Sequence, residues 1–169
     1  GGSAGSLIGR YEVVPYDTAI FSIYNSSTVS GYTSSGLIGT VANGSAYTNS
    51  SCKVMLVDIM NVGNINFKGF NGNVSKSSLL IGEVNNSIVH LYNAIVTGRV
   101  LDDELINYNS IIGTYNKATC VTSGDINNVY YVNGNDSVTN GFSLGIGIKK
   151  SITDLVKSST YTDWVDFED

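Results

Sequence analysis

Charged residues are scarce in this chain of 169 residues: nine are basic, fourteen are acidic, and together they make up 14%. An ordinary soluble domain carries about 25% charged residues. A protein that binds duplex nucleic acid needs a dense stripe of Lys and Arg, so a net charge of −5 argues against a nucleic-acid partner. The chain has one proline and no glutamine, and its composition is not that of a helical bundle.

Cysteine and long hydrophobic runs are also rare. The two cysteines, Cys52 and Cys120, are too few for a disulfide scaffold. They fall in repeats that are not adjacent, so we expect their Cα atoms to lie too far apart for a disulfide and both thiols to be unpaired and buried. The apolar run Val54–Met60 is only seven residues long, and we therefore expect no membrane insertion by this segment.

Neutral polar residues and glycine are abundant instead, with 22 Ser, 19 Asn, 13 Thr and 19 Gly. Short segments rich in β-branched and aromatic residues alternate with clusters of Gly, Asn and Ser, which is the pattern of strands joined by turns. The predicted strands include Tyr11–Val14, Ala19–Tyr24, Ser87–Leu91 and Ile126–Val132. Only Ser151–Lys157 approaches the spacing of a helix.

A short motif ending in Ile-Gly recurs along the chain and predicts a series of structural repeats. The isoleucines of successive copies are separated by 30, 43, 31 and 34 residues, and the spacing of 43 indicates either an insertion of about a dozen residues or an extra coil. The glycine after each isoleucine predicts a positive φ or a close approach of two backbones. The repeat positions are Ile8, Gly9, Ile38, Gly39, Ile81, Gly82, Ile112, Gly113, Ile146 and Gly147.

Two or three short strands in about 30 residues match one coil of a β-solenoid, whereas a propeller blade needs four strands and usually about 40 residues or more. Stacked coils place like residues on like, which favours neutral Asn, Ser and Thr over charges. We therefore predict an all-β fold, a parallel β-helix of about five coils. Residues 1–5 are expected to be a linker or a cloning remnant, 6–150 the solenoid, and 151–169 a C-terminal capping segment with a short helical turn and an aromatic, acidic tail.

The Leu-Ile-Gly copies, separated by Asn- and Ser-rich strands that end in Thr-Gly or Ser-Gly, resemble the GLUG-type repeats of large surface proteins. The tail Ser159–Phe167 is similar to the Thr-Tyr-x-x-Trp-Asp-Phe element that often closes such arrays, although Val165 interrupts the match. The resemblance covers roughly residues 6–167. It implies a β-helical scaffold of bacterial or protist surface proteins and no particular chemistry.

Few residues are candidates for chemistry. The single histidine, His90, is aligned by the repeat with Ser22 and is expected to be unpaired on the outer face of a strand. Asp58 is aligned with the corner asparagines Asn25 and Asn93, and it is the first candidate acid of a carbohydrate-active β-helix enzyme. We predict no catalytic and no cofactor-binding residue. We also predict no zinc site, because one His and two distant Cys cannot form one. The other candidate acids are Asp102 and Asp103, which with Glu104 are also the calcium candidates.

The leading functional hypothesis is a non-catalytic, extracellular structural or adhesive module: a stalk, an adhesin segment or a filament subunit. Its expected partners are other protein subunits or surface glycans, and a homo-oligomer through the solenoid ends is possible. The alternatives are the carbohydrate-active enzyme and a fibre that assembles end to end. Six sequons support a location outside the cell or at its surface, and they mark as glycosylation candidates Asn25, Asn43, Asn49, Asn73, Asn85 and Asn135.

Overall fold

The computed structural model describes residues 3–13, 16–31, 33–43, 53–66, 76–101, 108–116, 126–134, 146–162 and 164. This part of the chain is mostly β-strand with almost no helix, and all of its strand pairings are parallel. The prediction of an all-β fold is therefore confirmed. The predicted helical turn is present as a single short helix, α1, at Ile152–Leu155, followed by the 3-10 turn Ser158–Tyr161.

The strands fall into four sheets. The five-stranded sheet has the order β13-β12-β10-β7-β3, the four-stranded sheet has the order β11-β9-β6-β2, and two small sheets pair β1 with β5 and β4 with β8. The bounds of the strands are β1 Ser3–Gly5, β2 Ile8–Val13, β3 Thr18–Asn25, β4 Val29–Ser30, β5 Thr33–Ser35, β6 Ile38–Asn43, β7 Lys53–Asn61, β8 Ile65–Asn66, β9 Ile81–Asn85, β10 Ile88–Val96, β11 Ile112–Tyr115, β12 Ile126–Tyr131 and β13 Ile148–Lys149.

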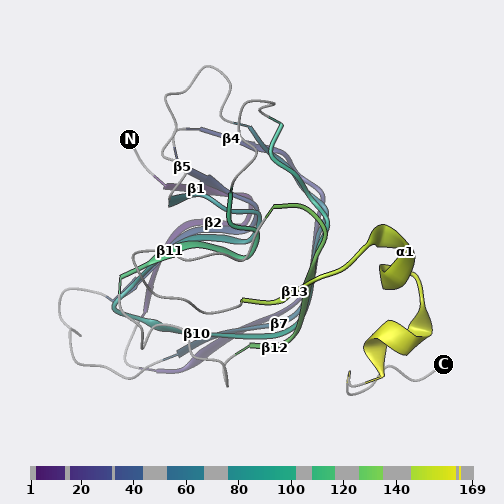
Figure 1. Cartoon of the computed structure of the whole chain (residues 1–169). Helices are drawn as coiled ribbons and strands as arrows, with labels where there is room; N and C mark the ends of the chain where they lie inside the picture. Colours follow the sequence, from purple (N-terminus) through teal and green to yellow (C-terminus); the bar gives the residue numbers. More distant parts are fainter. Residues whose placement is uncertain are drawn as a thin grey trace.

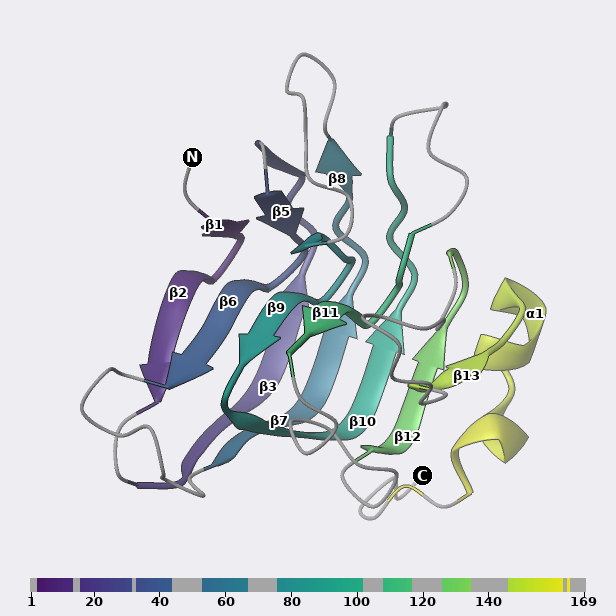
Figure 2. The same ribbon diagram turned by 60° about the vertical axis from the view of Figure 1, so that its left-hand side comes forward.

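Successive stretches of the chain run through the sheets in the same order, and we call each such stretch a layer. The first layer holds β1 to β4, the second β5 to β8, the third β9 and β10, and the fourth β11 and β12. Figure 1 looks along the direction in which the layers follow one another, and the four-stranded sheet faces the five-stranded sheet across the core. Figure 2 shows the strands of each sheet side by side, from β2 and β3 at one end to β12 and β13 at the other.

The Ile-Gly repeat positions set the register of the four-stranded sheet. Ile8 pairs with Ile38, Ile38 with Ile81, and Ile81 with Ile112. The separation of 43 residues between Ile38 and Ile81 therefore spans one layer and no extra coil, because these two residues are direct neighbours. Like side chains stack on like, as expected where equivalent strands of successive repeats pair.

The glycines of this repeat are required by the distance between neighbouring backbones. A Cβ atom added at Gly82 would lie 2.5 Å from the carbonyl oxygen of Gly39, and one added at Gly113 would lie 2.5 Å from that of Gly82. Neither glycine has a positive φ. Of the two reasons that the sequence offered for these glycines, the close backbone approach is the one found.

The fifth Ile-Gly copy is not equivalent to the other four, which corrects the prediction. Ile146 is buried in the core, but Gly147 has a φ of +85° and leads directly into β13. That strand pairs with β12 of the five-stranded sheet, through Tyr130 and Ile148. A left-handed glycine at the entrance of β13 thus replaces the close-packed glycine of the earlier copies.

The core lies between the sheets and is made almost entirely of aliphatic side chains, including Leu37, Leu56, Leu80 and Leu91. Tyr115 and Tyr131 also belong to it, and among the buried polar residues are two asparagines. Asn25 and Asn61 are paired in register, and the Asn25 Nδ2 donates to the Asn61 Oδ1 at 2.5 Å. Each side chain also donates to a main-chain carbonyl, Asn25 to Gly36 O and Asn61 to Leu79 O. This satisfies polar groups that would otherwise be costly to bury.

The described C-terminal segment, residues 150–162 and 164, lies beside the five-stranded sheet, on the side away from the core (Figure 1). The Trp164 ring stacks on Tyr130 with centroids 6.3 Å apart, Tyr161 packs edge-on against both rings, and the Tyr130 hydroxyl donates to Thr160 O. Tyr130 projects outward from β12. The segment that the sequence predicted to be a C-terminal cap therefore packs against the outward side of β12. Phe167 lies outside the described residues.

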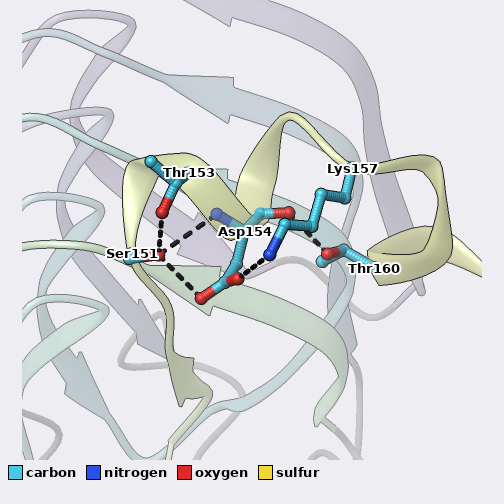
Figure 3. A network of polar contacts seen from close by, with 5 residues as sticks. All are labelled: Ser151, Thr153, Asp154, Lys157 and Thr160. Carbon is cyan, nitrogen blue, oxygen red and sulfur yellow. Dashed lines mark hydrogen bonds and ion pairs between the residues drawn. The ribbon is translucent and has the colours of Figure 1, made fainter.

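The start of α1 is held by a small polar network, drawn in Figure 3. The Ser151 hydroxyl accepts from the Asp154 main-chain nitrogen, as an N-cap does, and donates to the Asp154 carboxylate at 2.6 Å. Lys157 donates to the same carboxylate at 2.7 Å, and Thr160 Oγ1 donates to Asp154 O. The hydrogen bond from Lys157, followed by that from Ser151, lowers the pKa of Asp154 from its ordinary value of 3.8 to about 2.

This pKa shift predicts that the C-terminal segment loosens in acid. A carboxylate whose pKa is lowered by folding contributes stability above its ordinary value of 3.8, and that contribution is lost as the pH falls through about 2. Trp164 is the only tryptophan, so its fluorescence reports whether it is stacked on Tyr130. We expect the emission to change between about pH 4 and pH 2. Asp154→Asn should remove most of this pH dependence, and an unchanged titration in that variant would rule out Asp154 as its source.

Candidate binding surface

The outward side chains of β3, β7, β10 and β12 form the candidate site, which we call the outer face. Inward side chains are recognised by burial: Val54, Leu56 and Ile59 of β7 are buried, whereas Met55 and Val57 between them are half-buried. The pairing of β7 with its neighbours extends this alternation to every strand of the sheet. The outer face therefore consists of rows of residues that run from layer to layer.

A row of left-handed residues runs through the middle of the outer face. Ser22, Asp58, Asn93 and Asn128 have φ values between 53° and 57° and occupy equivalent places in β3, β7, β10 and β12. We call these four residues the polar row. Asn and Asp are the non-glycine residues that adopt this conformation most readily, because their short side chains can bond locally. The Asn93 Nδ2 donates to Asp58 Oδ1 at 2.9 Å, and the Asn128 Nδ2 donates to Asn93 Oδ1 at 3.2 Å.

The polar row changes the phase of each strand. A regular strand that points Leu56 inward would point Ile59 outward, because side chains alternate. The left-handed backbone of Asp58 shifts the alternation of side chains by one residue, so that both Leu56 and Ile59 are buried. Leu91 and Ala94 of β10 are buried in the same way on either side of Asn93. Because all four strands carry such a residue at equivalent places, they change phase together and stay in register.

The left-handed backbone predicts a difference between two substitutions at one site. Asn93→Ala should lower the free energy of unfolding by about 1–2 kcal/mol, because alanine resists a positive φ and cannot bond to Asp58 or Asn128. Asn93→Gly keeps the conformation available and should lose less than about 1 kcal/mol. Urea unfolding curves of the two variants test this, and equal losses would show that the backbone of residue 93 is not the limiting feature.

Apolar and aromatic rows flank the polar row. One row consists of Phe21, Val57 and Tyr92, and the other of Tyr24, Met60, Ile95, Tyr130 and Ile148. Phe21 and Tyr24 are each 66% exposed and Met60 is 41% exposed, whereas Tyr130 is covered by the aromatic residues of the C-terminal segment. The outer face thus offers flat apolar surfaces on both sides of a line of amide, hydroxyl and carboxylate groups, an arrangement suited to contacts with protein or sugar surfaces.

His90 faces outward from β10, as the buried Val89 and Leu91 on either side of it predict, but it is not exposed, and its alignment with Ser22 is wrong. Only 9% of the residue is exposed, and its Nδ1 lies 3.2 Å from the Tyr92 hydroxyl, with the two rings 6.0 Å apart and nearly parallel. In the sheet His90 pairs with Met55, and Ser22 is equivalent to Asp58 and Asn93. The two motifs Phe21–Asn25 and Val89–Asn93 look alike but are offset along their strands.

Asp58 is a member of the polar row and accepts a hydrogen bond from its neighbour in that row, Asn93. It shares its place with Asn93, as the sequence suggested, but not with Asn25, which pairs with Asn61 in the core. Its neighbours in the polar row are Ser22 and Asn93, so this row contains one carboxylate. Asp102, Asp103 and Glu104, which complete the sets of candidate acids and calcium ligands, lie outside the described residues. Within the described residues, no three His, Cys, Asp or Glu side chains gather as a metal site would require.

The candidate glycosylation sites are only partly described. Asn25 is buried with its amide nitrogen donating to Gly36 O and Asn61, so it is not the surface acceptor that its sequon indicated. Asn43 and Asn85 end β6 and β9 and are half-buried. Cys52 and Cys120 lie outside the described residues, as do the remaining sequons Asn49, Asn73 and Asn135.

Comparison with protein-family models, with curated proteins and with solved structures gives no match. In the described part of the chain, neither helical turn has the length or the apolar character needed to cross a bilayer. The outer face, with its polar row and its two apolar rows, is therefore the surface from which a function is argued below.

Proposed function

We propose that the chain is a parallel β-helix that acts as a non-catalytic structural module at a cell surface: a stalk, an adhesin segment or a filament subunit. Equivalent residues pair from layer to layer in both large sheets, and the layers pass through the sheets in the same order, which supports a helical winding of the chain. The cell-surface location is supported by the neutral polar composition and by the resemblance to GLUG-type repeats.

The observation that carries the proposal is the polar row. Enzymes that cleave polysaccharides on β-helices need at least two acid or base groups within reach of one glycosidic bond. Here the polar groups of the outer face bond to one another along the row, Asn128 to Asn93 and Asn93 to Asp58. Groups held in this way stabilise the stack, and the exposed apolar rows beside them favour adhesion.

The competing proposal is a carbohydrate-active enzyme with Asp58 as an acid. The whole chain is incubated with neutral and acidic polysaccharides, and both the bound protein and the soluble products are measured. The structural module predicts no products. Product formation that is abolished by Asp58→Asn would overturn the proposal, because an asparagine at this position can still accept the hydrogen bond from Asn93 and leaves the ladder in place. Ser22→Ala is the matched control, since it changes the same row in the first layer.

A further inference from the structure

The first layer leaves part of the core uncovered. Four inward residues of β2 and β3 are only half-buried, whereas the residues that pair with them in the second layer are almost completely buried. The core cluster includes the first-layer residues as partly buried members packed against it. The half-buried residues and their partners are Ile8 with Ile38, Tyr11 with Val41, Ile20 with Leu56, and Ile23 with Ile59.

The same layer ends both large sheets. Among the described strands, β2 and β3 each pair on one side only, β2 with β6 and β3 with β7. Their other edges present main-chain N–H and C=O groups that a further strand can pair with. At six and eight residues, β2 and β3 are among the longer strands of the molecule, so the unpaired edge is long.

The opposite end of the stack carries complementary features. The four-stranded sheet ends at β11 and the five-stranded sheet at β13. Helix α1 lies beside β13 (Figure 2). Its first residue, Ile152, is 53% exposed, and the residue after the helix, Val156, is 78% exposed. This part of the chain also carries Lys149, Lys150 and the ion pair Lys157–Asp154, so its described charges sum to +2. The first layer carries Asp17 and the ion pair Arg10–Glu12, so its described charges sum to −1.

We propose that the partner of the first layer is a second copy of this chain, joined head to tail. In this arrangement the first layer of one copy, with β2 and β3, faces the end of the preceding copy that carries β11 and β13, and its half-buried core residues become buried. The inference rests on the proposed β-helix. Of the three structural modules in that proposal it selects the filament subunit, and it identifies the two surfaces that join.

One apolar row of the outer face runs through all four layers and into β13. The row extends from Tyr24 in the first layer to Ile148 in β13, and α1 lies beside its last members (Figures 1 and 2). A second copy that continues the row places its own Tyr24 and Phe21 next to the exposed Ile152 and Val156. The two surfaces differ, so the contact is heterologous and each copy keeps one free end for the next.

The test uses the whole chain and measures mass in solution from about 1 µM to about 1 mM, where mass action reveals weak association. One variant, Phe21→Lys/Tyr24→Lys, places two charges on the exposed first-layer strand, a device that natural edge strands use against pairing. The second, Val156→Asp, changes the other end. The matched control is Val57→Lys/Met60→Lys, which makes the same change at the paired positions one layer further in.

We expect the wild type and the control to form an open series of oligomers, and each end variant alone to associate at least about tenfold more weakly. A mixture of the two end variants should give a one-to-one dimer and nothing larger, because each variant retains the surface that the other lacks. A wild type that stays monomeric, a closed dimer, or a mixture that does not combine would overturn the head-to-tail contact. If such a monomer still has the circular dichroism of a β protein and yields no polysaccharide products, the proposed function stands and only this inference fails.

Discussion

Gly82→Ala is expected to destabilise the protein by about 3 kcal/mol or more, a large part of the total stability of a domain of this size. The added Cβ would lie 2.5 Å from Gly39 O and 2.6 Å from Lys76 O, and both are main-chain atoms that cannot rotate away. The third and second layers would have to separate locally, which would weaken the hydrogen bonds between β9 and β6. Chemical denaturation followed by circular dichroism measures the loss.

Gly9→Ala is the matched control for this prediction. Gly9 occupies the same position of the repeat in the first layer, where no described strand lies beneath it. The nearest atom to its added Cβ is Ser3 O at 3.1 Å, so a loss of less than about 1 kcal/mol is expected. Equal losses at the two positions would mean that the glycines are needed for their own backbone conformation and not for the approach of neighbouring layers.

Asn61→Leu is the second substitution with a large expected effect, a loss of about 2–4 kcal/mol. Leucine has the same branching and the same number of side-chain heavy atoms as asparagine and is larger, so the substitution opens no cavity and the loss arises chiefly from hydrogen bonding. The Asn61 amide donates to Leu79 O, and its Oδ1 accepts from Asn25. Removing it leaves a buried carbonyl and a buried amide hydrogen without these partners. Thermal unfolding of the variant and the wild type gives the difference.

A double-mutant cycle measures the coupling energy between Asn25 and Asn61. The equivalent position is Val96 in the third layer and Tyr131 in the fourth, so the core accepts apolar residues at this place. The double variant Asn25→Val/Asn61→Val should therefore lose less than the sum of its two single variants, by about 0.5–3 kcal/mol. Strictly additive losses would show that the two amides act independently, despite the 2.5 Å contact between them.

The sequence was most informative where a residue type is required by the packing of whole layers. The Ile-Gly pairs at Ile8, Ile38, Ile81 and Ile112 lie in register. After Ile38, Ile81 and Ile112 only glycine permits the close approach to the backbone of the preceding layer. The all-β class followed from the same repeat and from the short β-branched segments. A weaker resemblance at Ile146 was misleading, since two residues of sequence do not distinguish a close-packed glycine from a left-handed one.

Which residues lie on the outer face was harder to predict, because the prediction assumed that inward and outward side chains alternate without interruption along each strand. In Phe21-Ser22-Ile23 the left-handed Ser22 lies between an outward and an inward residue, so the observed alternation hides a change of phase. The signal was present in Leu56-Val57-Asp58-Ile59, where two inward apolar residues lie three apart with Asp between them. The placement of Trp164 on Tyr130 could not be read from the sequence, because it depends on tertiary packing of a short segment.

The spacing of the layers has a consequence for how the chain folds and how its length can change. Strand pairs between successive layers join residues 30 to 43 apart, whatever their position in the chain. The entropy of closing a loop grows only with the logarithm of its length, so the shortest and longest of these closures differ by about 0.3 kcal/mol. Each layer therefore nucleates on the one before it at nearly the same entropic cost, and none of the described strand pairings has to wait for the distant end of the chain. A gene that gains or loses one repeat would alter the height of the stack while leaving the folding of every other repeat unchanged.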